Sequence, residues 1–170
     1  MYISRRLRWS TLTFWQYNVP SMQQYHVLHD NSCNIFIDSD ALTIRVNETS
    51  FGKLNAAKNL NIGIRLWCDK RAKILHLENY GLSKIYWTCP GLEKTTGEFK
   101  KANLVRPGQK AVVFNLNLVK SVAKSCYPLV ETNLINISLG KFWGIGSRRS
   151  SVEMCPCWLS VSVNLEYFEI

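Results

Sequence analysis

The amino-acid sequence predicts a mainly β domain with the architecture of a sandwich or a barrel, and three observations support this. Short segments in which apolar and polar residues alternate recur from residue 11 to residue 163, and alternation is the period of a half-buried strand. Turn residues separate these segments, with Pro107-Gly108 as the clearest pair. The 170 residues, of which 46% are hydrophobic, suffice for a core of ordinary size. We therefore treat residues 1–170 as a single domain.

The predicted strands are short and follow one another along the chain with turn residues between them. They cover residues 11–16, 35–37, 42–46, 62–66, 74–77, 85–87, 111–114, 135–139 and 159–163. A series of short strands with few helices favours two packed sheets or a closed sheet over a helical architecture.

Two segments have a helical period instead. Residues 115–126 place apolar side chains on one stripe and Lys120 and Lys124 on the opposite side. The apolar stripe consists of Leu116, Val119, Val122 and Ala123. Residues 50–60 have a weaker pattern, which Gly52 interrupts.

The charge of the chain predicts the kind of partner. Lysine and arginine outnumber the acidic residues by 21 to 12, which gives a formal net charge of +9. Such a surplus predicts a nucleic acid, a phosphoprotein or an acidic membrane surface as partner. No segment reaches the ~18 consecutive apolar residues of a membrane span, and residues 9–15 alternate too regularly for a signal peptide. We therefore expect a protein made in the cytosol, without a membrane partner.

The residues that carry enzyme or metal chemistry form no recognisable site. The six cysteines lack a C-x-x-C pair and the spacing of a zinc module, so we expect buried free thiols. His26, His29 and His76 are expected in strands or turns, without a metal. No G-x-S-x-G, Walker or Rossmann pattern occurs, and the acidic residues are isolated. The sequence predicts neither an enzyme nor a bound cofactor or metal.

The segment between the last two predicted strands has the most informative composition. Residues 141–151 combine Trp143, a hydrophobic anchor, with Gly144 and Gly146, which permit unusual backbone angles. Three cations fall within nine positions of this segment: Lys141, Arg148 and Arg149. Cations that converge on a rigid loop form a phosphate or carboxylate clamp. A solvated basic loop has the same composition, so both interpretations stay open at this point.

A longer stretch, INISLGKFWGIGSRRSSVEMCPCWLSVSV (residues 135–163), resembles the last strands and the third loop of the Smad C-terminal domain, also called Mad homology 2. The family pattern there is Lys-x-Trp-Gly, then Tyr-Arg-Arg, then Pro-Cys-Trp. The matching residues are Lys141, Trp143-Gly144, Arg148-Arg149 and Pro156-Cys157-Trp158. Residues 9–15, 63–67 and 107–115 resemble other parts of the family in the same order, so the resemblance covers most of the chain.

The resemblance implies a Smad/FHA-like β-sandwich with a loop-helix region at one end and a reduced helical bundle at the other. Family members form trimers, carry signals from TGF-β-type receptors to the nucleus and regulate transcription. The third loop of each subunit binds the phosphorylated Ser-x-Ser tail of its neighbour. The implied partners are therefore other Smad-type proteins, with receptor kinases and transcription cofactors as further ones. The implied location is cytoplasmic and nuclear.

Carried over position by position, the resemblance assigns phosphoserine binding to Lys141 and Arg149. A third lysine of the family falls near Val112, which cannot bind phosphate, so Lys110 on the same strand face becomes the third candidate. Contacts with a receptor or partner are implied for the rest of the loop, namely Trp143, Gly144, Ser147, Arg148 and Ser151.

The chain departs from the family in four places. Ser147 replaces the tyrosine of the loop, and Val112 replaces the third lysine. Residues 126–134 are too few for the long fourth helix of the family. The final helix is reduced to residues 165–168, and no Ser-x-Ser tail precedes Ile170. The expectation is a chain that accepts a phosphorylated tail without donating one.

Two other functions remain as alternatives. A truncated or degenerate relative could fail to assemble and instead compete with intact relatives. A basic nucleic-acid-binding β domain is the other alternative, and its binding would weaken steeply with salt. Its contacts would come from Arg5, Arg6, Arg8, Lys100, Lys101, Arg106 and Arg148. Sequence-specific DNA binding is not expected.

Overall fold

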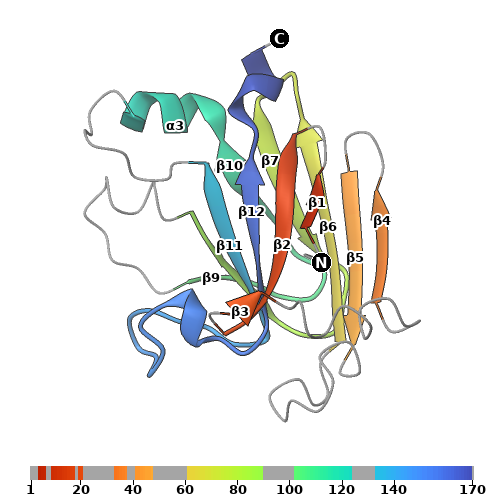
Figure 1. Ribbon diagram of the computed structural model, residues 1–170, viewed down its shortest axis with the longest axis vertical. Coiled ribbons are helices and arrows are strands. Elements are labelled where there is room, and N and C mark those ends of the chain that lie inside the picture. The colour runs from red at the N-terminus through yellow and green to blue at the C-terminus, as the bar shows by residue number, and fades with distance from the viewer. Residues whose placement is uncertain are drawn as a thin grey trace.

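The computed structural model describes residues 4–6, 9–17, 19–20, 33–37, 41–47, 61–89, 102–123 and 133–169, and two antiparallel sheets dominate these residues (Figure 1). The first sheet has the order β1-β2-β12-β11-β8-β9, with β3 also paired to β2. Its strands are β1 (Ser4–Arg6), β2 (Ser10–Gln16), β3 (Val19–Pro20), β8 (Ile85–Thr88), β9 (Asn103–Val105), β11 (Leu134–Leu139) and β12 (Trp158–Val163).

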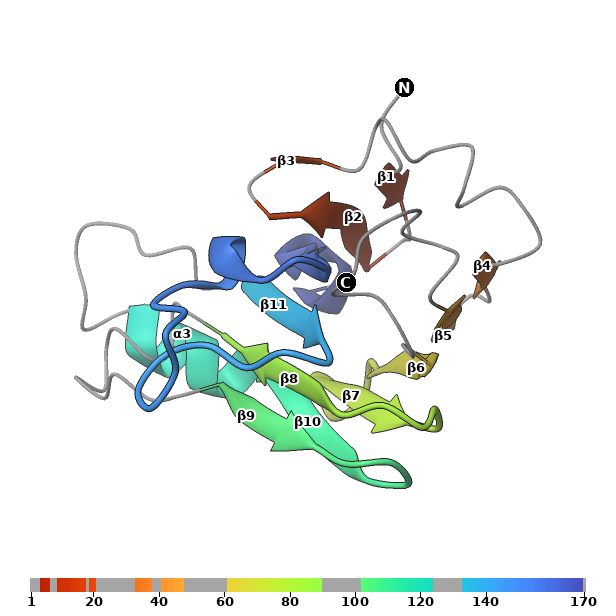
Figure 2. The ribbon, with the colours of Figure 1, turned by 90° about the horizontal axis from the view of Figure 1, so that it is seen from below.

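The second sheet has the order β10-β7-β6-β5-β4. Its strands are β4 (Cys33–Ile37), β5 (Ala41–Asn47), β6 (Asn61–Asp69), β7 (Ile74–Asn79) and β10 (Lys110–Asn115). The view from below shows that β9 leads directly into β10, so the chain passes from the first sheet to the second at this edge (Figure 2).

All nine strands predicted from alternation are present, each with slightly wider bounds. The strands β1, β3 and β9 were not predicted, because segments of two or three residues are too short to show a period. The predicted helix at 115–126 is confirmed as α3 (Leu116–Ala123). It begins where the Asn115 side-chain oxygen accepts a hydrogen bond from the Leu118 N–H at 3.3 Å, an N-cap. Residues 124–126 and the second predicted helix, 50–60, lie outside the described residues.

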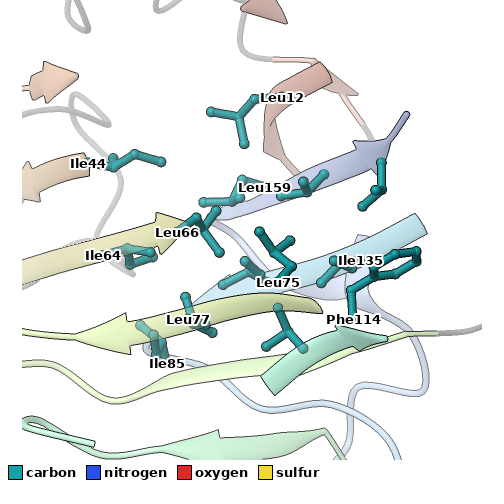
Figure 3. Packing of buried hydrophobic residues seen from close by; sticks show 14 of the residues in the cluster. Leu12, Ile44, Ile64, Leu66, Leu75, Leu77, Ile85, Phe114, Ile135 and Leu159 are labelled. Carbon is teal, nitrogen blue, oxygen red and sulfur yellow. The ribbon is translucent and has the colours of Figure 1, made fainter. Parts of the chain in front are cut away.

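The inner faces of the two sheets bury one continuous hydrophobic core between them. Figure 3 shows Leu12, Ile135 and Leu159 of the first sheet facing Leu66, Leu75 and other residues of the second. Each fully buried side chain of this kind stabilises the fold by about 1.5–3 kcal/mol relative to the same side chain in water. The alternation of the strands arises because their other face points away from this core.

Asn79, the last residue of β7, links the two sheets through hydrogen bonds of its side chain. The buried Asn79 side chain donates hydrogen bonds to the carbonyl oxygens of Ser83 and of Val105 in β9, both at 2.9 Å, and accepts one from the Gly81 N–H at 3.1 Å. Gly81 lies so close to Gly63 of β6 that a Cβ on Gly81 would fall 2.3 Å from the Gly63 nitrogen. Only glycine permits this approach.

The two ends of the sandwich differ. The helix α3 and the 3₁₀ helix η4 (Leu165–Glu169) lie at one end, where Phe168 packs against Phe114 with ring centroids 6.0 Å apart (Figure 1). The connection between β11 and β12, which contains the 3₁₀ helix η3 (Val152–Met154), lies at the other end. The expected β-sandwich is confirmed, and the described residues place a loop with a short 3₁₀ helix at one end and α3 with η4 at the other.

Candidate functional site

The connection between β11 and β12, residues 140–157, packs against the outer face of the first sheet; we call it the basic loop. Its Trp143, Val152 and Cys155 form a second hydrophobic cluster, together with Ala102 before β9 and Trp158 in β12. This cluster explains why β11 is buried from Ile135 to Leu139 on both faces. The inner face of β11 contacts the main core, and its outer face lies under the basic loop.

A pair of tryptophans forms the floor of this second cluster. Trp15 of β2 and Trp158 of β12 are directly opposite each other in the sheet, and their rings stack with centroids 5.1 Å apart and planes 7° apart. The Trp15 indole N–H donates to the Ser160 hydroxyl at 2.9 Å, and that of Trp158 donates to the Tyr17 carbonyl at 2.7 Å. Because both polar groups are satisfied, the rings have fixed orientations. The prediction that Trp143 anchors the loop is confirmed, since only 7% of it is exposed.

The tip of the basic loop is held by its own hydrogen bonds. The Gly144 N–H donates to the Arg149 carbonyl at 2.7 Å, and the Ser147 N–H donates to the Gly144 carbonyl at 3.0 Å. Gly144 and Gly146 have φ angles of +93° and +86°, the left-handed region that favours glycine. The Ser147 hydroxyl donates to the Phe142 carbonyl at 3.2 Å and accepts from the Arg149 N–H at 3.0 Å. Ser147 therefore fixes the backbone next to Arg149.

Two of the three cations of the basic loop are partly withdrawn from water. Lys141 and Arg149 are half-buried, whereas Arg148 is exposed. The buried Cys155 lies against both: its thiol donates to the Lys141 carbonyl at 3.7 Å. Burial raises the pKa of the Cys155 thiol, and the positive charge of Arg149 offsets part of that rise. Among the described residues, none of the three cations forms an ion pair, so their charge is open to an external anion.

Lys110, the third predicted phosphate ligand, comes from the other sheet. Its ammonium lies 3.9 Å from the Glu78 carboxylate and 5.8 Å from the centre of the Trp67 ring, both on the outer face of that sheet. Val112 is exposed on the same strand face. The structure thus gives Lys110 a carboxylate partner of its own, unlike Lys141 and Arg149.

The sequence of the chain matches the model of a known protein family. The model of the MH2 domain matches residues 7–164, a range that contains both sheets from β2 to β12 and the whole basic loop. The chain belongs to the MH2 domain family. MH2 domains are the C-terminal domains of Smad signal transducers, and at the level of the family they are non-enzymatic modules for protein–protein interaction. A search of curated proteins found no match.

The basic residues and the cysteines outside the binding pair lie in several parts of the MH2 domain. Arg106, in the turn before β10, and Arg148 are exposed; Arg5 and Arg6 lie in β1, and Arg8, Lys100 and Lys101 lie outside the described residues. Cys68, Cys89, Cys155 and Cys157 are buried, as expected, and Cys155 and Cys157 are free thiols. Across the ranges that the structure describes, no three metal-ligating side chains gather together, and no helix is long and apolar enough to cross a membrane.

The sequence alone did not predict which residues outside the basic loop anchor it. Trp15, Tyr86 and Ala102 lie far from the loop in sequence but pack under it. Alternation does place Trp15 on the face opposite Leu12 and Phe14. However, only the register of β2 with β12 brings Trp15 against Trp158.

Proposed function

We propose that this MH2 domain is a subunit of a TGF-β-type signalling pathway that binds the phosphorylated Ser-x-Ser tail of a partner Smad-type protein. Lys141 and Arg149 of the basic loop bind the phosphate in this proposal. In this proposal the chain and its Smad-type partners form hetero- or homotrimers that regulate transcription. This role requires both a cytoplasmic and a nuclear location. The observation that carries the proposal is the pair of half-buried cations on a loop fixed by a tryptophan cluster.

The rigidity of the loop supports this function. Trp143 is buried against Trp158, and its carbonyl accepts a hydrogen bond from the Ala102 N–H at 3.0 Å. The backbone on either side of Arg149 is fixed by Gly144 and Ser147. A site of this kind loses little conformational entropy on binding, because the backbone that carries the cations is already ordered.

The charge of the loop also suits a phosphate. Lys141, Arg148 and Arg149 against Glu153 give residues 140–157 a net charge of +2. A phosphoserine adds about −1.5 to −2 charges at neutral pH. The guanidinium of Arg149 can bind two phosphate oxygens at once, and the ammonium of Lys141 adds a point charge. Phosphorylation would therefore convert a weak contact into several charge-assisted hydrogen bonds.

Binding of synthetic peptides tests the proposal directly. Fluorescence anisotropy measures the affinity of a labelled Ser-x-Ser tail peptide, phosphorylated or not, for the purified chain. We expect the phosphorylated peptide to bind and the unphosphorylated one to bind at least tenfold more weakly. Lys141→Ala and Arg149→Ala should each weaken phosphopeptide binding about 10–100-fold, the range for loss of a charge-assisted hydrogen bond worth 1.5–3 kcal/mol.

Two further variants serve as controls. Arg71→Ala removes an equal charge from an exposed turn between β6 and β7, at the α3 end of the sandwich, and should leave the affinity unchanged. Lys110→Ala tests whether a cation already paired with Glu78 takes part. Equal binding of the two peptides, or equal losses in Arg71→Ala and Arg149→Ala, would refute the clamp.

A further inference from the structure

The basic loop contains a sequence that protein kinases recognise. Arg148 and Arg149 precede Ser151 by three and two positions. Kinases select their substrates largely by the pattern of charge around the acceptor residue, and arginines at these two positions suit a kinase whose cleft is acidic. We propose that Ser151 is a phosphorylation site for such a basophilic serine/threonine kinase, and that its phosphorylation closes the basic loop to other phosphates.

The surroundings of Ser151 suit this reaction. Arg148 and Ser150 are exposed, and Ser151 is half-buried. The backbone at Ser151 is extended, with φ −141° and ψ 162°, and its side chain makes no capping hydrogen bond to η3. The neighbouring hydroxyl differs, since Ser150 donates to the sulfur of Met154 at 3.4 Å. Ser151 therefore offers an uncommitted hydroxyl at a position where the backbone is extended.

The segment can also be lifted without disturbing the core. The Ser150 N–H and hydroxyl both bond to the Met154 sulfur, a weak acceptor, at 3.4 Å. The tryptophan cluster lies on either side of the segment, at Trp143 and from Val152 onward. Residues 150–151 therefore lie between two fixed points, and their release costs the hydrogen bonds of Ser150 and Ser151 to Met154 and no buried apolar area of the main core. The bonds of Gly144 and Ser147 still hold the backbone of Arg149.

The transfer itself is an ordinary phosphoryl transfer from ATP. The Ser151 Oγ–P bond forms as the bond between the γ-phosphorus and the bridging oxygen of ADP breaks, and the hydroxyl proton passes to the base of the kinase. The product carries about −1.5 to −2 charges. It reduces the net charge of residues 140–157 from +2 to about zero, since no other group of the loop changes.

The consequence follows from the closeness of Ser151 and Arg149 in the chain, and it rests on the proposed function of the loop. A phosphate on Ser151 is two residues from Arg149 and belongs to the same loop. An intramolecular group has an effective concentration near the millimolar range. It therefore competes with a phosphorylated tail from another chain, and its negative charge also repels that tail.

The experiment uses the whole chain, the catalytic subunit of cyclic-AMP-dependent protein kinase as the basophilic enzyme, and Mg-ATP. Intact mass and peptide mapping should show one phosphoryl group, on Ser151. Ser150→Ala should incorporate it to the same extent, and Ser151→Ala should not. Kinase treatment should then weaken binding of the phosphorylated Ser-x-Ser peptide at least tenfold. Kinase treatment should not change the affinity of the Ser151→Ala variant for the phosphorylated Ser-x-Ser peptide.

Other results would each contradict one part of the proposal: the site, the closing of the loop, or the function on which it rests. Incorporation on Ser150, or no incorporation under conditions that fully phosphorylate a control peptide with the same sequence, would overturn the site. Phosphorylation of Ser151 with unchanged peptide affinity would overturn the closing of the loop. If the untreated chain binds no phosphopeptide, the proposed function fails, whereas the mass measurement still decides whether Ser151 is modified.

Discussion

The two hydrophobic clusters of this MH2 domain differ in what surrounds them. The main core lies between two sheets and draws residues from both of them and from η4. The cluster under the basic loop has a sheet on one side only, with Trp15 and Trp158 as its floor and Trp143 as its cover. The first cluster holds the whole sandwich together, whereas the second holds one loop in place.

The main core therefore determines the stability of the domain, whereas the cluster under the basic loop determines the proposed ligand binding. The main core sets the global free energy of unfolding, because every strand that it joins depends on it. The loop cluster can open locally, at a lower free energy, while the two sheets stay packed. Substitutions in the first should therefore change stability most, and substitutions in the second should change ligand binding most.

The contact of Gly81 with Gly63 should give the largest effect. Gly81→Ala places a Cβ 2.3 Å from the Gly63 nitrogen, so the backbone of β6, a central strand of the second sheet, must move. We expect a loss on the order of 4 kcal/mol in the free energy of unfolding, the range of exceptional substitutions. Gly146→Ala is the matched control on the loop, where φ is +86° and no atom lies within 4 Å. The Gly146→Ala variant should lose only about 1–2 kcal/mol, from backbone strain. Urea unfolding measures the free energy of unfolding of both variants. Similar losses in the two variants would contradict this account.

A pair of large-to-small substitutions tests the comparison itself. Ile137→Ala in the main core should lower the free energy of unfolding by about 2–5 kcal/mol, while the folded fraction keeps its affinity for phosphopeptide. Trp143→Ala should lower global stability less, because the loop detaches before the sheets separate, but it should weaken phosphopeptide binding at least tenfold. Urea unfolding and fluorescence anisotropy on both variants give the four values. The reverse pattern would show that the clusters are not independent.

The smallest effect is a dependence on pH. Burial raises the pKa of the Cys157 thiol to about 12 from an ordinary 9.0. Well below pH 9 the Cys157 thiol is protonated in both the folded and the unfolded chain. As the pH rises through 9, the unfolded chain loses this proton while the folded chain keeps it, so the free energy of unfolding falls. The loss from this thiol between pH 9 and pH 10.5 is about 1–2 kcal/mol. Cys157→Ala should therefore show a shallower fall than the wild-type chain over this range, and equal slopes would rule out this cause.

Much of the fold was predictable because alternation is a local signal. In β12, for example, Leu159, Val161 and Val163 alternate with serines, and the structure buries these three against the other sheet. The cap of α3 and the two-residue and three-residue strands were not predicted. A cap depends on one residue, Asn115, and strands such as β3 exist only because a neighbour supplies their hydrogen bonds.

The site was predicted in composition but not in arrangement. The sequence by itself determined which cations the loop carries, that Trp143 would anchor it, and to which family its pattern belongs. Only the tertiary structure decided that the loop lies on Trp15 and Trp158, that Ser147 holds the backbone of Arg149, and that Lys110 pairs with Glu78. The physical reason is that the period of a strand fixes which face a side chain takes, whereas its neighbours depend on strand order and register between segments far apart in the chain.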